Sequence, residues 1–155
     1  MSSSDDARAI MSRGVRAASL LEATFSQALT RDEDRRLELV RDLTRDIKEQ
    51  LEVLASPATP ELSSKPSPGL IAEAALRCAD LANLAACNLD GLPGPEATRA
   101  GAGVRLAAET VQALRRLSEE RPGTLPETHP AVLRDIQGSG WRADLAVRQT
   151  DERVG

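Results

Sequence analysis

The chain has 155 residues, of which 41% are hydrophobic and 28% are charged, and its formal net charge is −4 at pH 7. These values predict one soluble globular domain rather than a disordered chain. The mild net acidity argues against non-specific nucleic-acid binding, which needs a basic face to contact phosphates. With one Trp, one Phe and no Tyr, the chain also lacks the aromatic side chains on which bases stack.

The abundance of helix-forming residues favours an all-α fold. Ala occurs 24 times and Leu 21 times, against 12 Val and Ile together, and β-branched residues are the ones that prefer strands. We predict a four-helix bundle made of two helical hairpins, with a Pro-rich crossover linker and a C-terminal extension. The bundle is expected over 1–121, with hairpins at 5–55 and 70–121 and the linker at 56–69. The extension, 122–155, is expected to be partly disordered.

Two apolar stripes define the first predicted hairpin. Each repeats at three- and four-residue spacing, as one buried helix face does. The first comprises Ala7, Met11, Gly14, Ala18, Leu21, Phe25 and Ala28, and the second comprises Leu37, Val40, Leu43, Ile47, Leu51 and Leu54. Residues 30–33, Thr-Arg-Asp-Glu, could form a capping box that starts the second helix. One long helix whose apolar face changes sides is the alternative, because neither Gly nor Pro marks the turn.

The second predicted hairpin follows the linker. Ser67 and Pro68 suit the N-cap and first position of a helix, and Gly91 suits a left-handed C-cap. The apolar positions of the third helix are Ile71, Ala74, Cys78, Leu81 and Ala85, and those of the fourth are Ala97, Ala100, Val104, Ala107, Val111 and Leu114. The small residues on both stripes predict close packing of the helix axes.

The C-terminal extension is less clearly patterned. A short helix from Ala131 is expected to end at Gly138. Residues 141–147 alternate between apolar and polar side chains at strand period, yet they are helix formers, so helix and extended chain both remain open. Residues 150–155 are expected to be disordered.

The sequence contains no recognisable catalytic or metal-binding motif. The single His, His129, precedes a proline in a predicted loop, and no Glu-x-x-His pair or nucleophile elbow occurs. Cys78 and Cys87 are interpreted as small apolar core residues. Gly101 and Gly103 lie within a helical pattern and are interpreted as a close-packing site rather than a phosphate loop. We therefore expect no metal and no cofactor.

Four polar residues on the third predicted helix form a candidate ligand pocket: Glu73, Arg77, Asp80 and Asn83. Polar side chains on a mostly buried helix either have structural partners or line a binding site. The segment 68–76, Pro-Gly-Leu-Ile-Ala-Glu-Ala-Ala-Leu, with the Ala-rich helix that follows, resembles a helical segment of the folate-linked cyclodeaminase bundles. The glycine-rich N-terminal motif of that family is absent, and the chain is not assigned to it.

The extension also holds a candidate partner anchor, formed by Leu133, Ile136, Trp141, Leu145 and Val147. An exposed Trp beside aliphatic residues would be an apolar patch of the kind that monomers seldom leave uncovered. Trp and Arg are also over-represented among the residues that dominate binding energies. The alternative is that this segment docks on the chain's own helices.

These observations favour a non-enzymatic helical-bundle protein that mediates protein–protein interaction or self-association, with a protein partner or a second copy of the chain. The alternative is a helical enzyme or small-ligand-binding subunit whose site is completed between protomers. No apolar run is long enough to span a membrane, and no signal peptide is recognised. We expect a cytoplasmic protein that contacts neither nucleic acid nor membrane.

Overall fold

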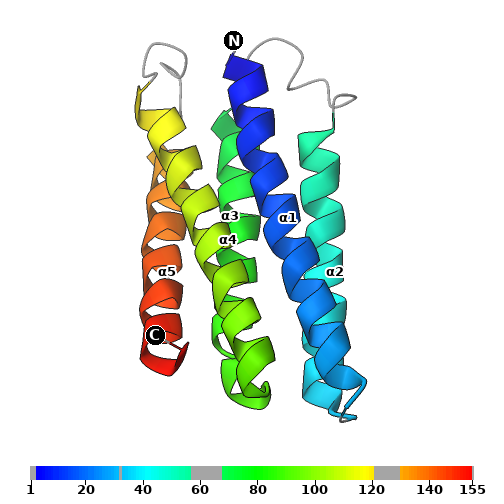
Figure 1. Cartoon of the computed structure of the whole chain (residues 1–155). Coiled ribbons are helices and arrows are strands. Elements are labelled where there is room, and N and C mark those ends of the chain that lie inside the picture. The colour runs from blue at the N-terminus through cyan, green and yellow to red at the C-terminus, as the bar shows by residue number, and fades with distance from the viewer. Residues whose placement is uncertain (1–2, 32, 57–67, 121–129, 155) are drawn as a thin grey trace.

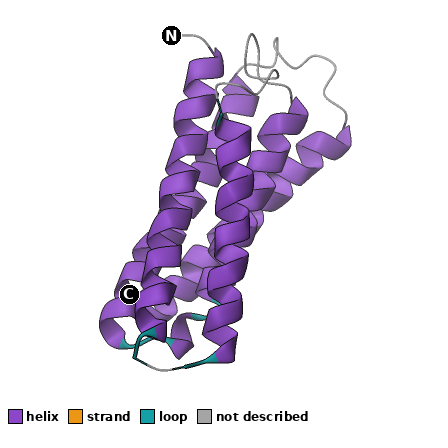
Figure 2. Ribbon diagram, turned by 90° about the vertical axis from the view of Figure 1, so that its right-hand side faces the viewer, coloured by secondary structure: helices purple, strands orange, loops and turns teal. Residues whose placement is uncertain are grey.

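The computed structural model describes residues 3–31, 33–56, 68–120 and 130–154. They form five α-helices, and the described residues contain no strand (Figure 2). The α-helices are α1 (Ser3–Leu29), α2 (Arg35–Ala55), α3 (Pro68–Ala86), α4 (Gly94–Glu120) and α5 (Pro130–Val154), and one 3₁₀ turn, η2 (Leu89–Gly91), precedes α4. The all-α prediction is confirmed. The predicted N-cap Ser67, most of the predicted linker and His129 lie outside the described residues.

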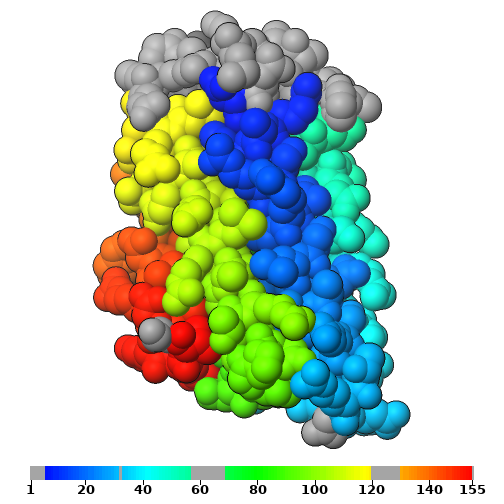
Figure 3. Space-filling view, in the orientation of Figure 1, coloured from blue at the N-terminus to red at the C-terminus, as the bar shows by residue number. Residues whose placement is uncertain are grey.

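The five helices run side by side along one long axis, and successive helices alternate in direction (Figure 1). Helix α1 packs against α2 and α4, while α3 packs against α4, α5 and, over a smaller contact, α2. Helix α5 lies against α3 and α4. Figure 3 shows α1 and α4 together on one face, with α5 and α2 at its two edges. The molecule therefore contains one more long helix than the sequence predicted.

The chain breaks between the first two helices. Helix α1 ends at Leu29, and Asp34 caps α2 by accepting a hydrogen bond from the backbone N–H of Arg36 at 2.8 Å. This break excludes a single continuous helix over both stripes. The predicted capping box at 30–33 is wrong because the hydroxyl of Thr30 donates to the carbonyl of Gln27, at the end of α1 (2.6 Å).

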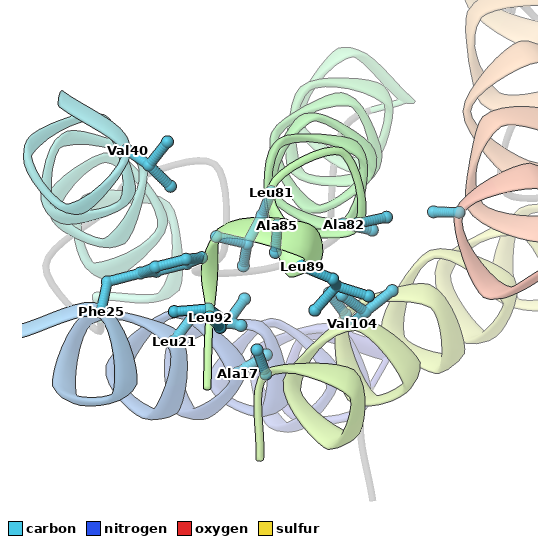
Figure 4. Packing of buried hydrophobic residues seen from close by; sticks show 14 of the residues in the cluster. Ala17, Leu21, Phe25, Val40, Leu81, Ala82, Ala85, Leu89, Leu92 and Val104 are labelled. Carbon is cyan, nitrogen blue, oxygen red and sulfur yellow. The ribbon is translucent and has the colours of Figure 1, made fainter. Parts of the chain in front are cut away.

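Buried side chains follow the predicted stripes closely in three helices. Every predicted position of α1, α3 and α4 is buried, from Ala7 to Ala28, from Ile71 to Ala85 and from Ala97 to Leu114. The largest side chains of this core include Leu21, Phe25 and Leu81. Figure 4 shows them meeting Leu89 and Val104 between the helices. Burial on this scale is the main driving force for folding.

One position of the α2 stripe is wrong. Leu43 is exposed, and Thr44 is fully buried in its place. Leu37, Val40, Thr44 and Leu51 are buried, and Ile47 and Leu54 are half-buried. These follow an unbroken alternation of three- and four-residue steps, which Leu43 does not. The Thr44 hydroxyl is satisfied within the helix because it donates to the carbonyl of Val40 at 2.7 Å.

Two glycines of α4 allow neighbouring helices to approach. A Cβ atom at Gly103 would lie 2.7 Å from Cδ2 of Leu21 in α1, and one at Gly101 would lie 2.9 Å from Cγ2 of Val154 in α5. Both distances are shorter than real Cβ contacts. The interpretation of this Gly-x-Gly as a helix-packing site is therefore confirmed.

Two glycine-based expectations for helix ends are wrong. Helix α3 ends at Ala86, Gly91 closes the 3₁₀ turn η2, and no glycine in the described ranges has a positive φ. Gly138 does not end a helix either, because α5 continues through it to Val154. The buried positions of α5 explain this: Ile136, Ser139, Ala143, Ala146 and Thr150 repeat at helical spacing.

Candidate functional site

The four predicted pocket residues lie along α3, where two of them form an ion pair and the other two have hydrogen-bond partners. Glu73 and Arg77 form an ion pair one turn apart on the exposed side of the helix, with 3.7 Å between Oε1 and NH2. Such exposed pairs contribute little to stability, typically a few tenths of a kcal/mol. Their geometry is that of a solvated helix face.

The other two predicted pocket residues already have partners. Asp80 Oδ1 accepts a hydrogen bond from Arg142 NH2 of α5 at 2.6 Å. Asn83 Nδ2 donates to the carbonyl of Ala79 at 3.0 Å. Asp80 therefore joins α3 to α5. The sequence could not reveal this pairing because it spans 62 positions and depends on where α5 docks.

Two surface hollows lie elsewhere. One, of about 510 Å³, is at the α1–α2 turn and is lined by Leu29, Glu33, Arg35, Glu38 and Arg41. The other, of about 350 Å³, lies between α4 and α5 and is lined by Arg105, Ala108, Glu109, Gln112, Arg116, Asp144 and Val147. Both contain charges of both signs, and neither is lined by Glu73, Arg77, Asp80 or Asn83.

The predicted partner-anchor residues divide between two faces of α5. Ile136 is buried in the core and Val147 is half-buried against it. Leu133, Trp141 and Leu145 are exposed, and Trp141 keeps 82% of its surface accessible to solvent. The inner face of α5 therefore docks on the chain's own helices, whereas Leu133, Trp141 and Leu145 remain exposed, and their role as a partner anchor stays a prediction.

Polar contacts fix the docked position of α5 along its length. Arg105 of α4 pairs with Asp151 at 2.8 Å, and Asp90 of η2 pairs with Arg153 at 2.7 Å. Gln112 Nε2 donates to the carbonyl of Gly140 at 3.0 Å. Together with the Asp80–Arg142 bond, these contacts connect α5 to three other elements. The helix is therefore an integral part of the packed structure.

Charged side chains of both signs surround Trp141, and exposed Asp144 and Glu152 lie on the same side of α5. Arg134 and Arg148 stand seven residues before and after Trp141, so all three lie nearly in line on the outer face of α5. Neither arginine forms an ion pair with any residue that the structure describes. We call the surface formed by Trp141, Leu145, Arg134 and Arg148 the α5 outer face. Its residues can offer an aromatic ring, an aliphatic side chain and two guanidinium groups to another molecule.

The two thiols occupy opposite environments, and both are free. Cys78 is fully buried as predicted, and burial raises the pKa of its thiol to about 12 because the thiolate is poorly solvated there. Cys87 is exposed beyond the end of α3, so its interpretation as a core residue is wrong.

One buried carboxylate lies at the opposite end of the bundle from the chain's N-terminus. Glu96, in the first turn of α4, has no exposed surface, and its Oε1 lies 3.1 Å from NH1 of Arg31. The two groups form an ion pair, but neither carboxylate oxygen of Glu96 accepts a hydrogen bond from a described residue. A carboxylate near a helix N-terminus is stabilised by the helix dipole. We interpret Glu96 as a structural tie between α4 and the α1–α2 turn.

Among the described residues, no three His, Cys, Asp or Glu side chains gather as a metal site requires. In the same part of the chain, every helix is too short or too polar to cross a lipid bilayer. Comparisons with protein-family models, with curated proteins and with solved structures found no match to this chain.

Proposed function

We propose that this chain is a non-enzymatic interaction protein that binds another protein chain through the α5 outer face. In this proposal α1 to α4 form the two-hairpin scaffold, and α5 presents the binding residues. The observation that carries the proposal is Trp141, the most exposed large apolar side chain of the described residues, at the centre of a helix whose opposite face is firmly docked.

Physical considerations support a binding role for this tryptophan. Leaving an indole in water forgoes the free energy that its burial would supply, on the order of 25 cal/mol per Å² of apolar surface. Tryptophan and arginine are also the residue types most enriched among those that dominate binding energies. The rigid, docked helix reduces the conformational entropy that binding would otherwise cost.

Site-specific photo-crosslinking in cells tests this proposal. A photoreactive amino acid replaces Leu145, one turn from Trp141, and a control replaces Arg13, which is exposed on α1. We expect crosslinked products of defined mass from position 145 and none from position 13. The Trp141→Ser substitution should abolish them while leaving the thermal unfolding temperature unchanged. Equal crosslinking from both positions, or crosslinking that survives Trp141→Ser, would contradict the proposal.

A small-ligand-binding function is the second candidate, and the hollow between α4 and α5 favours it. Gln112 lines this hollow, and its buried Oε1 atom has no hydrogen-bond partner among the described residues. A ligand with a hydrogen-bond donor could satisfy this oxygen. A thermal-shift screen of metabolites tests this candidate, because a ligand at a hundred times its dissociation constant stabilises by about 2.7 kcal/mol. A hit that Gln112→Ala removes would support it, and a screen without hits would count against it.

A further inference from the structure

The buried face of α5 contains few large apolar side chains. Its buried residues are Ile136, Ser139, Gly140, Ala143, Ala146 and Thr150. Only Ile136 among them is a large aliphatic residue. Helix α2, at the opposite edge of the molecule (Figure 1), buries Leu37, Val40 and Leu51 besides Thr44. Each helix adds three half-buried apolar residues. Because hydrophobic stabilisation grows with the apolar area removed from water, α5 gains less from docking than α2 does.

Buried polar atoms without a hydrogen-bond partner lie on both sides of the α5 interface. On α5 they are Oγ of Ser139, which is 1% exposed, and Oε1 of Gln149. On α4, Oε1 of Gln112 is also without a partner among the described residues, although its Nε2 atom bonds to α5. In contrast, the atom of this kind opposite α2, Oε2 of Glu22, lies within ion-pair distance of Lys48. Polar atoms that are buried without partners oppose docking.

The ion pairs of α5 do not compensate for this. They join α5 to Asp80, Asp90 and Arg105, and at least 35% of every side chain in these pairs is accessible to solvent. Ion pairs that are this exposed contribute little to stability and weaken in salt. They therefore define where α5 docks more than how strongly it is held.

The other four helices contact one another without α5. Helix α1 packs against α2 and α4, and α3 packs against α4 and α2. The main helix contacts of α5 are with α3 and α4, at one edge of the molecule (Figure 1). Departure of α5 would therefore separate none of the contacts among α1 to α4.

We propose that α5 undocks from the other four helices as one unit, in a partial opening that costs less free energy than unfolding of the whole chain. Cooperative segments of folded proteins open with free energies that range from near zero up to that of global unfolding. Docked α5 remains by far the most populated state. This inference does not depend on the proposed function. Because a ligand stabilises the state that it binds, a molecule that binds docked α5 would suppress the opening.

Thiol labelling at buried positions tests the proposal. Thr150→Cys on α5 and Thr44→Cys on α2 form a matched pair, because both threonines are fully buried and donate to the carbonyl four residues earlier. Ser139→Cys adds a position in the middle of α5. Every variant also carries Cys87→Ser, which removes the exposed thiol.

The native Cys78 reports unfolding of the whole chain. Its Sγ atom lies 2.8 Å from the position that a Cβ of Gly14 would take, so α1 covers this thiol whether or not α5 is docked. At pH 8 we expect positions 139 and 150 to be labelled at similar rates. Each should be labelled at least about ten times faster than positions 44 and 78.

Two labelling results would overturn the inference. Equal rates at positions 44, 78 and 139 would mean that α5 leaves only when the whole chain unfolds. Fast labelling at 150 with slow labelling at 139 would mean that only the end of the helix frays. Hydrogen exchange of the unmodified chain covers the case in which a cysteine variant does not fold. The amides in the middle of α5 should exchange at least about ten times faster than those in the middle of α2, and equal protection of the two helices would contradict the proposal.

Discussion

At the scale of single residues, the closest helix contacts depend on glycines whose lack of a side chain is used in packing. A methyl group at Gly103 would meet both Cδ2 and Cγ of Leu21 at 2.7 Å, and Cγ is not a flexible chain end. We therefore expect Gly103→Ala to destabilise the protein by about 1–3 kcal/mol, as overpacking does. Thermal or urea unfolding followed by circular dichroism measures this change.

Gly138 is the matched control for that substitution. It also lies within a helix, but nothing stands within 4 Å of an added Cβ. Because glycine in a helix interior is less favourable than alanine by about 0.5–1 kcal/mol, Gly138→Ala should stabilise the protein. If the two substitutions had the same effect, the close approach of α1 and α4 at Gly103 would be wrong.

The two cysteines should differ sharply in reactivity. Since the thiolate is the reactive form, the buried Cys78 with its pKa near 12 should resist thiol reagents at pH 8, and the exposed Cys87 should react. We expect one labelled thiol per native chain and two after unfolding in urea, counted by mass spectrometry. The raised pKa also means that Cys78 supports folding below pH 9 and loses this contribution as the pH rises toward 12. Labelling of two thiols in the native chain would contradict the buried position of Cys78.

Sequence patterns located most of the buried residues, and the exceptions have local causes. In α2, hydrophobicity predicts that Leu43 is buried, whereas the regular three- and four-residue spacing predicts Thr44. The structure follows the spacing. Threonine can occupy a buried helix position because its hydroxyl bonds to the preceding turn. The sequence could not show that Asp80 joins α3 to α5, because its partner Arg142 belongs to a part of α5 that the sequence did not predict as helix.

At the scale of helices, the two faces of α5 differ in burial, so substitutions on them should differ in their effect on stability. Ile136 is buried in the core and Leu133 is exposed on the same helix. We expect Ile136→Ala to cost about 2–5 kcal/mol, as removal of a buried aliphatic side chain does, and Leu133→Ala to cost much less. Chemical denaturation of both variants measures the difference. Equal and small effects would mean that α5 does not dock as described.

The sequence did not predict the full length of α5, because most residues on its buried face are small and some are polar. Ser139, Gly140 and Thr150 hold buried positions that hydrophobicity alone does not mark. The two glycines and the alternation around Trp141 suggested a break where the helix continues. Deletion of α5 would expose the core residues that Ile136, Ala143 and Ala146 cover. Such a deletion would therefore lower stability as well as remove the α5 outer face, so it would not test binding alone.

At the scale of the whole molecule, the apolar stripes revealed which faces are buried but not which helices meet. The contact between α1 and α4 depends on Leu21 entering the space above Gly103, and the contact between α3 and α5 includes the Asp80–Arg142 pair. Both arise only when distant segments are brought together. The same arrangement places α2 and α5, which both carry exposed apolar side chains, at opposite edges of the molecule.

The chain contains one tryptophan, so its fluorescence reports directly on the α5 outer face. We expect dilute protein to show the red-shifted emission and easy quenching of an indole in water. When the protein that crosslinks to position 145 is added, the emission should shift to the blue and quenching should fall, because Trp141 becomes covered by that protein. Emission that is already blue-shifted and protected in dilute solution would contradict the exposed position of Trp141. Emission that stays red-shifted after that protein is added would contradict binding through the α5 outer face.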